Sequence, residues 1–169
     1  MGGPPVRVAL AGPMGAGKST VGRLLAARWG VPFVDLDAEI GDIPAIFARE
    51  GEAGFRRREQ ETLRSVVHGP GSRGEGPLTQ GVLALGGGTV VDPVNRALLQ
   101  EWRVVVLMGA AETLRARIGD TPGRPLAAQL ESLLVARAEA WRAAGPQVCT
   151  DGLEPAAVAD RVEALCGFR

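Results

Sequence analysis

Short apolar runs alternate with longer amphipathic stretches along most of the chain. The runs short enough for buried strands are residues 6–11, 33–36, 82–85, 103–107 and, more weakly, 147–150. Apolar residues with helical spacing lie between and after these runs, in residues 21–29, 43–49, 54–67, 93–101, 112–118, 127–144 and 155–165. Strands that alternate with helices are typical of a parallel sheet with helices on both faces. We therefore predict a three-layer α/β/α fold around a five-stranded parallel sheet.

The first predicted strand runs directly into a glycine-rich loop. This loop reads Gly12-Pro-Met-Gly-Ala-Gly-Lys-Ser19, with the spacing G-x-x-x-x-G-K-S, and a helix follows it. In such a loop Gly12, Gly15 and Gly17 let backbone amides turn toward phosphate oxygens, and the helix N-terminus favours negative charge. Lys18 would reach the β- and γ-phosphates of a nucleoside triphosphate, and Ser19 would ligate Mg²⁺. A chance match is the alternative, and the flanking strand and helix argue against it.

The basic residues of the chain are almost all arginines. Lysine and arginine together number 19, and Lys18 is the one lysine among them. A compact ammonium on a flexible stem fits where a wide planar guanidinium does not. The choice of residue therefore supports a specific role for Lys18 in phosphate binding.

Two carboxylates, Asp35 and Asp37, stand at the end of the second predicted strand. Residues i and i+2 of a strand point to the same side, so both carboxylates are expected to face one cleft. One could hold Mg²⁺ or its water, and the other could accept a hydroxyl proton. A solvated acidic turn is the alternative.

Three glycines, Gly86 to Gly88, follow the third predicted strand. Without side chains they would let the backbone approach a ligand closely, although a simple turn is the alternative. All these groups follow the carboxyl ends of predicted parallel strands, which meet at one edge of a sheet. We therefore expect them to converge on one crevice.

Several arginines are candidates for binding an anion. Arg56 opens a run of three on one predicted helix, and either an exposed charged helix, with pairs such as Arg56–Glu59 and Arg57–Glu61, or a contact with an anionic substrate would explain it. Arg124 lies in the Gly/Pro-rich residues 119–125, where a lid could bring a cation onto a transferring phosphate. Arg137 lies on the long helix, where a solvated face is equally compatible with the sequence.

The composition of the chain limits the kinds of partner that it is expected to bind. The formal net charge is zero, so no broad basic field indicates binding to nucleic acid or to a membrane surface. No apolar run approaches the length of a membrane span. Cys149 and Cys166 lack a metal-ligand spacing and suit a reduced, cytoplasmic protein. The length suits one domain, residues 1–169.

Taken together, the motifs resemble those of shikimate kinases, and the match runs nearly end to end. The matching segments are residues 15–20, 35–37, 43–47, 51–59, 85–88 and 124–126, together with Arg137 four residues before an aromatic side chain. The resemblance implies a P-loop fold of the nucleoside monophosphate kinase type with the strand order 2-3-1-4-5. It also implies transfer of the γ-phosphoryl group of ATP to the 3-hydroxyl of shikimate, in the pathway to chorismate and the aromatic amino acids.

The resemblance also implies residue roles. Those implied to contact shikimate are Asp37, Arg56, Gly86, Gly87, Gly88 and Arg137. Those implied to bind ATP are Gly12, Gly15, Ala16, Gly17, Lys18, Ser19, Thr20, Arg117, Arg124 and Pro155. Ser19 and Asp35 would serve Mg²⁺, and Lys18, Asp37 and Arg124 would be catalytic. A substrate-binding segment at about 38–68 and a lid at about 117–130 are expected, in a monomer whose partners are ATP and shikimate.

Two alternatives stay open. A P-loop kinase for another small hydroxy acid, such as gluconate, would also need cations for a carboxylate. A non-catalytic nucleotide-binding homologue would keep the fold, although the presence of Lys18, Asp37 and Arg124 argues against it. The chain departs from the family pattern at Trp141, where tyrosine is usual, and in two segments that look shortened.

Overall fold

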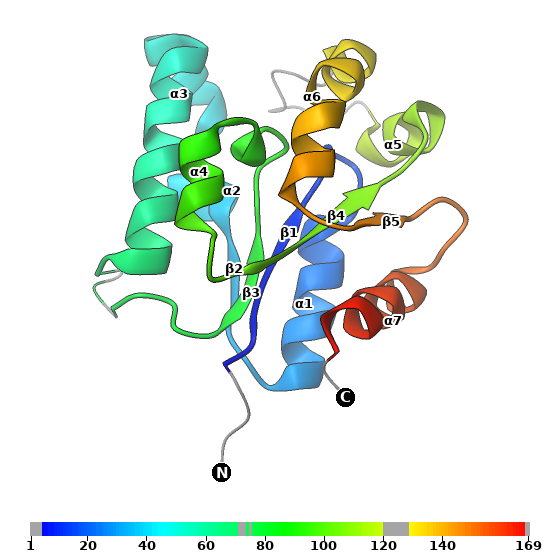
Figure 1. The fold of residues 1–169 in the computed structure, drawn as a ribbon. Helices are drawn as coiled ribbons and strands as arrows, with labels where there is room; N and C mark the ends of the chain where they lie inside the picture. The colour runs from blue at the N-terminus through cyan, green and yellow to red at the C-terminus, as the bar shows by residue number, and fades with distance from the viewer. Residues whose placement is uncertain (1–4, 71–73, 75, 120–128, 168–169) are drawn as a thin grey trace.

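The computed structural model describes residues 5–70, 74, 76–119 and 129–167. At its centre lies a five-stranded parallel sheet in the order β2-β3-β1-β4-β5 (Figure 1). The strands are β1 (Arg7–Ala11), β2 (Phe33–Asp35), β3 (Gly81–Ala84), β4 (Arg103–Met108) and β5 (Gln147–Cys149). The predicted fold class and the strand order implied by the resemblance are both confirmed.

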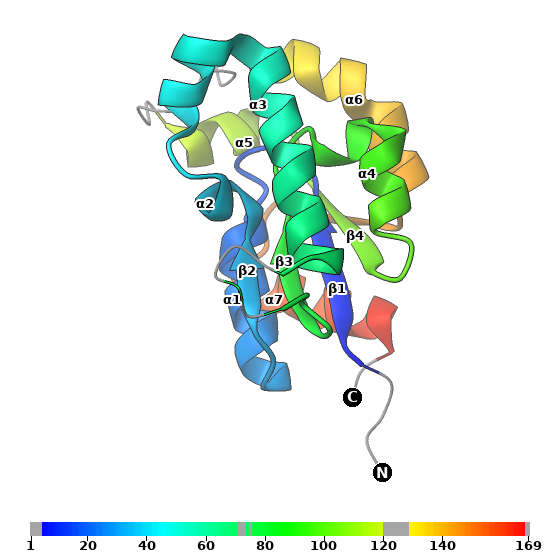
Figure 2. The same ribbon diagram turned by 90° about the vertical axis from the view of Figure 1, so that its left-hand side faces the viewer.

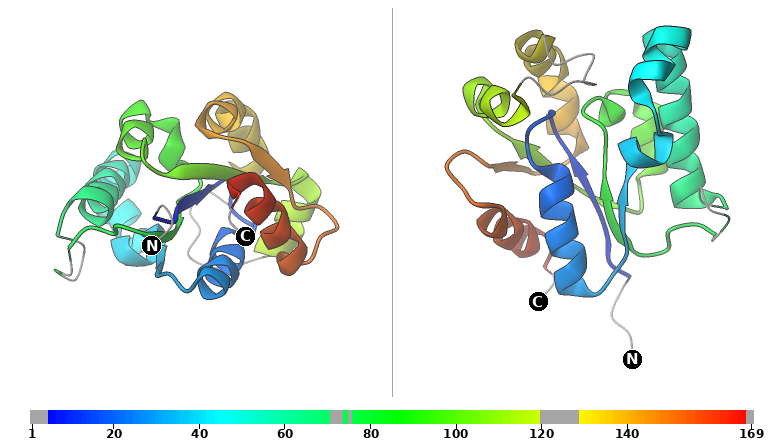
Figure 3. Two further views of the ribbon diagram at one scale, coloured as in Figure 1. Left: turned by 60° about the horizontal axis from the view of Figure 1, so that its bottom comes forward. Right: turned by 180° about the vertical axis from the view of Figure 1, so that it is seen from behind.

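Helices cover both faces of this sheet. On one face lie α1 (Lys18–Trp29) and α7 (Pro155–Cys166), which pack against each other. On the other lie α3 (Ile43–His68), α4 (Pro93–Leu98) and α6 (Leu130–Ala144), and Figures 2 and 3 show the layers from other sides. Three shorter elements are α2 (Leu36–Ile40), the 3₁₀ helix η1 (Thr89–Val91) and α5 (Ala111–Ile118). None of the helices in the described ranges combines the length and apolar character that a membrane crossing requires.

Strand β1 divides the core into two halves. Val8 and Leu10 pack with α1 and α7, whereas Ala9 and Ala11 pack with α3 and α6, and all four are fully buried. Alternate side chains of a strand point to opposite faces, so a strand covered on both sides must be apolar at every position. The unbroken apolar run in residues 8–11 has this cause.

Neighbouring strands all pair in parallel, so their carboxyl ends lie along one edge of the sheet, and those of β1 and β3 point toward the top of Figure 1. The phosphate loop follows β1, helix α2 follows β2, and the three glycines follow β3. The expectation that these groups share one edge is confirmed.

The surroundings of Asp37 were predicted wrongly. The second strand ends at Asp35, and Asp37 lies in the first turn of α2 rather than on a strand. Asp35 is the N-cap of this helix, and its carboxylate accepts a hydrogen bond from the backbone N–H of Asp37 at 3.2 Å. An aspartate at the N-cap accepts a hydrogen bond from a first-turn amide that has no partner within the helix. It therefore favours the start of a helix, and the strand ends here.

Helix α3 is one element with an internal break. Gly51 has φ 67° and ψ −172°, which interrupts the helix between the two segments predicted at 43–49 and 54–67. A positive φ is readily available only to glycine, so the break is encoded at this residue. The predicted start of the later long helix, at residue 127, lies outside the described residues, and α6 is described from Leu130.

Candidate active site

The phosphate loop has the backbone that its glycines predict. Gly12, Gly15 and Gly17 have φ of 124°, 79° and 89°, and a Cβ on Gly12 would lie 2.0 Å from the carbonyl oxygen of Leu107. Helix α1 starts at Lys18, its N-cap is Gly17, and its first turn contains no acidic residue. The first backbone amides of α1 therefore donate no hydrogen bond to an acidic side chain of the helix's first turn. Such amides at a helix N-terminus are suited to binding a phosphate.

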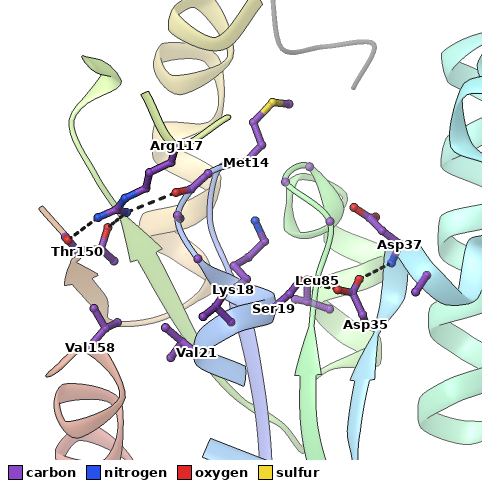
Figure 4. A pocket seen from close by; sticks show the side chains of 18 of the residues that line it. Met14, Lys18, Ser19, Val21, Asp35, Asp37, Leu85, Arg117, Thr150 and Val158 are labelled. Carbon is purple, nitrogen blue, oxygen red and sulfur yellow. Dashed lines mark hydrogen bonds between the residues drawn. The ribbon is translucent and has the colours of Figure 1, made fainter. Parts of the chain in front are cut away.

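Lys18 and Ser19 lie at the mouth of this loop. The Lys18 Nζ donates hydrogen bonds to the carbonyl oxygens of Gly12 at 2.9 Å and Pro13 at 2.8 Å. Figure 4 shows Lys18 between Arg117 and Thr150 on one side and the two aspartates on the other. The ammonium thus stands between the two halves of the cleft, where a transferring phosphoryl group would pass.

Asp35 connects the phosphate loop with the start of α2. Its Oδ2 accepts a hydrogen bond from the Ser19 hydroxyl at 2.5 Å, while its Oδ1 accepts the N–H of Asp37. Carboxylate and hydroxyl oxygens are the ligands that Mg²⁺ prefers, usually completed by phosphates and water. No group of three or more His, Cys, Asp or Glu side chains that could hold a metal occurs in the described residues. The Ser19 hydroxyl and the Asp35 carboxylate are of the ligand type that Mg²⁺ prefers.

Of the three consecutive arginines, one lines the cleft and two are exposed on the outer side of the helix. Arg56 lines the cleft, and its guanidinium donates to Glu59 at 2.8 Å and to Glu52 at 3.4 Å. Arg57 and Arg58 are 69% and 47% exposed and pair instead with Glu50, so the suggested pair Arg57–Glu61 is replaced by a contact across the break at Gly51. The Arg56–Glu59 pair is confirmed.

Arg137 is buried rather than solvated. It is 8% exposed on α6, and in the described part of the chain it has no carboxylate within 4.0 Å. Burial lowers the pKa of its guanidinium, the positive charge of Arg56 lowers it further, and Glu52 and Glu59 oppose this. A buried cation beside a second cation is costly without an anion, so this corner of the cleft is suited to a bound carboxylate.

Two of the three glycines, Gly86 and Gly88, make room for charged side chains of the protein itself. A Cβ on Gly88 would lie 2.7 Å from the Arg56 guanidinium. A Cβ on Gly86 would lie 2.7 Å from Glu59 Oε2 and 3.0 Å from Asp37 Oδ1. Neither glycine has a positive φ, so close approach rather than backbone shape demands glycine at these two positions.

The nucleotide side of the cleft is formed by α5 and the loop before α7. Arg117 donates to the Thr150 hydroxyl at 2.8 Å and to the Thr150 carbonyl at 2.9 Å. Asp151 accepts the N–H of Ala110 through both oxygens, at 3.1 and 3.0 Å, and this bond lowers the pKa of its carboxyl. Pro155 lines the same end of the cleft at the start of α7.

One cleft of about 980 Å³ brings these groups together. The predicted site residues on its wall are Gly15, Ala16, Gly17, Lys18, Ser19, Thr20, Asp35, Asp37, Arg56, Gly86, Gly87, Gly88, Arg117, Arg137 and Pro155. Gly12 lies at the buried base of the loop, and Arg124 lies outside the described residues.

Sequence reasoning did not place Glu59 and Thr150 on the wall of the cleft, and it did not identify Thr89 and Asp151, which form hydrogen bonds behind this wall. Glu59 belongs to the motif F-R-x-x-E, whose spacing to Arg56 was the only signal that pointed to it. The only signal for Thr89 was its position directly after the three glycines. Thr150 and Asp151 had no signal in the sequence.

This fold and cleft define a P-loop phosphotransferase: a phosphate loop and a pair of arginines face each other across the end of a 2-3-1-4-5 sheet. A family model described as shikimate kinase matches residues 14–164. The chain belongs to the shikimate kinase family. The predicted resemblance is thereby confirmed.

Named relatives and solved structures agree with this family. The chain is 39% identical to a shikimate kinase of Marinomonas sp. over 168 residues, covering 92% of this chain and 88% of that protein. It is 45% identical to one of Nitrosomonas europaea over 128 residues, which is 72% of this chain but 56% of that protein. The structure of shikimate kinase from Acinetobacter baumannii in complex with shikimate is 32% identical and superimposes with a TM-score of 0.85, covering 98% and 96% of the two chains.

Proposed function

We propose that this chain transfers the γ-phosphoryl group of ATP to the 3-hydroxyl of shikimate, giving shikimate 3-phosphate on the route to chorismate and the aromatic amino acids. The observation that carries the proposal is the buried Arg137 beside Arg56, opposite a phosphate loop in the same cleft. Such a pair suits one carboxylate, and guanidinium groups bind carboxylates in a bidentate manner. The solved relative that holds shikimate has the same fold, which supports this choice of acid.

ATP would occupy the side of the cleft formed by α1, α5 and the start of α7. The amides at the start of α1, Lys18 and Thr20 would meet the phosphates, and Arg117 and Pro155 would border the base. Ser19 and Asp35 would hold Mg²⁺, which when bound supplies neutralisation of phosphate charge. Phosphoryl transfer depends mainly on positioning and charge, which these groups provide.

The acceptor would lie between α2, α3, α6 and the three glycines. Arg56 and Arg137 would hold its carboxylate, and the backbone of Gly87 would meet ring hydroxyls. Asp37, on the wall of the cleft beside Gly86, would contact the reacting hydroxyl and take its proton. A fixed carboxylate at one end and a fixed hydroxyl at the other would orient the ring for transfer.

The proposal includes the organisation of the chain. We assign one kinase domain, residues 1–169, with a substrate-binding segment at about 38–68 and a lid at about 117–130 that brings Arg124 over the phosphates. We further propose that the chain acts as a monomer. Cys149 and Cys166 are both free thiols, which suits the cytoplasm.

An ADP-release assay tests the function directly. With shikimate as acceptor we expect turnover that requires Mg²⁺, and with gluconate or without an acceptor we expect a rate at least about a hundredfold lower, because a misplaced hydroxyl loses the positioning on which transfer depends. Phosphorus NMR should identify the product as a 3-phosphate. Turnover with gluconate alone would make the chain a sugar-acid kinase, and nucleotide binding without turnover of either acid would make it a non-catalytic homologue.

Replacing Arg56 by alanine should weaken shikimate binding and spare ATP. Loss of a charge-assisted pair of hydrogen bonds predicts a rise in the dissociation constant for shikimate of about a hundredfold. Calorimetry with each ligand measures both effects. The matched control is Arg57→Ala, which removes the neighbouring, exposed arginine and should change neither affinity. Unchanged shikimate affinity in Arg56→Ala would remove Arg56 from the site.

A further inference from the structure

Arg56 is held by a chain of hydrogen bonds that reaches behind the glycine loop. Its guanidinium donates to Glu59 Oε1 at 2.8 Å, and the other oxygen, Oε2, accepts the hydroxyl of Thr89 at 2.7 Å. Glu59 is 1% exposed and Thr89 is fully buried. Both oxygens of a buried carboxylate are therefore occupied, one by the substrate-side arginine and one by the hydroxyl.

The hydroxyl of Thr89 is not needed for its own turn. The N–H of Thr89 donates to the carbonyl of Gly86 at 3.2 Å, and the carbonyl of Thr89 accepts the side-chain amide of Asn95 at 2.9 Å. These backbone bonds hold η1 in place and so define where the hydroxyl stands. The hydroxyl is thus a pre-oriented donor directed at Glu59, and glutamate has several rotamers that need such a restraint.

Geometry around Gly86 shows why that restraint matters. The Thr89 Oγ1, the Glu59 Oε2 and the Asp37 Oδ1 all lie within 3.0 Å of the point where a Cβ of Gly86 would be. Two carboxylates that share so small a space repel each other, and a donor on one of them reduces that repulsion. Without the hydroxyl, Glu59 would be free to turn, and Arg56 would move with it.

We propose that Thr89 is a positioning residue for substrate binding: its hydroxyl fixes Glu59, and Glu59 fixes the guanidinium of Arg56 against Gly88 and beside Arg137. Thr89 itself does not touch the substrate. This inference rests on the proposed function for the identity of the acid, but the arrangement of Thr89, Glu59 and Arg56 belongs to the free protein.

The test compares three variants that differ by few atoms. Thr89→Val keeps the shape and removes the donor, Thr89→Ser keeps the donor, and Thr89→Ala removes both methyl and hydroxyl in case valine prevents folding. For Thr89→Val and Thr89→Ala we expect the KM for shikimate to rise about tenfold, the value of one hydrogen bond to a charged group. The KM for ATP should stay within about twofold, and Thr89→Ser should restore the KM for shikimate, because its hydroxyl can still reach Glu59.

A second measurement follows Arg56 without any substrate. In protein labelled with ¹⁵N-arginine, the guanidinium signal of Arg56, assigned by its loss in Arg56→Lys, should show slow rotation in the wild type and in Thr89→Ser, and faster rotation in Thr89→Val. An unchanged KM for shikimate, an equal rise in both KM values, failure of serine to restore binding, or an Arg56 signal insensitive to the valine would each overturn the inference. If the wild type does not phosphorylate shikimate, the proposed function fails, while the Arg56 signal still decides on Thr89.

Discussion

Replacing Lys18 by methionine is expected to lower kcat by about a hundred- to a thousandfold, because it removes a cation that we propose neutralises charge on the transferring phosphoryl group. The structure supports this size of effect. The Lys18 Nζ already lies at the loop, where it donates hydrogen bonds to the carbonyl oxygens of Gly12 and Pro13. Steady-state ADP release at saturating shikimate and ATP measures the loss.

Lys18→Arg is the informative companion to this variant. It keeps the positive charge, yet the wide guanidinium does not fit where an ammonium contacts two carbonyl oxygens, so we expect it to be nearly as slow as Lys18→Met. Shikimate affinity, measured by calorimetry, should not change in either variant because we propose other residues for binding of the acid. A Lys18→Arg enzyme with kcat within about threefold of the wild type would show that charge alone suffices, contrary to the expectation from shape.

Replacing Asp37 by asparagine should have an effect of similar size on a different step. Loss of a general base costs about a hundred- to ten-thousandfold in kcat. Asparagine keeps the shape and one oxygen acceptor, so substrate should still bind, with the KM for shikimate changed far less than kcat. The same ADP-release assay, run over a range of shikimate concentrations, separates the two constants.

Glu39→Gln provides the control for Asp37→Asn. Both residues belong to the short helix α2, and each substitution removes one negative charge from its first turn. Only Asp37 lines the cleft, so Glu39→Gln should retain the wild-type kcat. If Asp37→Asn kept more than about a third of the activity, Asp37 would orient the hydroxyl without accepting its proton, since loss of a true base costs far more.

The sheet and the phosphate loop were predictable from the sequence because each rests on local pattern. Strands buried on both faces are apolar throughout, so the apolar runs 8–11 and 104–107 could be recognised as strands from the sequence. The spacing of Gly12, Gly17 and Lys18 is equally local, since one loop and one helix turn contain it. Strand ends and the short elements were less well predicted.

Helix α2 is an element that hydrophobic periodicity could not predict. Its five residues are too few to display a helical period, and an aspartate at each of two alternate positions is equally compatible with a strand. The available signal was Asp35 as an N-cap followed by acidic residues in the first turn. This signal would have placed Asp37 on a helix instead of a strand. The prediction that Asp37 faces the cleft does not change.

Burial of charge was not predictable. Glu59 and Arg137 are residue types that are almost always exposed unless paired, and nothing in their local sequence marks them as buried. Their burial follows from the meeting of α3, α6 and the glycine loop, which are far apart along the chain. For the same reason the three glycines could be recognised as unusual, although the side chains they accommodate could not be named.

By itself, the sequence determined the fold class, the phosphate loop with its single lysine, and, through resemblance, the family and most of the candidate site. Only the tertiary structure decided that Glu59 and Arg137 are buried and that Arg56 is held through Glu59 by Thr89. The physical reason is that local propensity and spacing act over a few residues. The cost of placing one charge next to another depends on segments that only folding brings together.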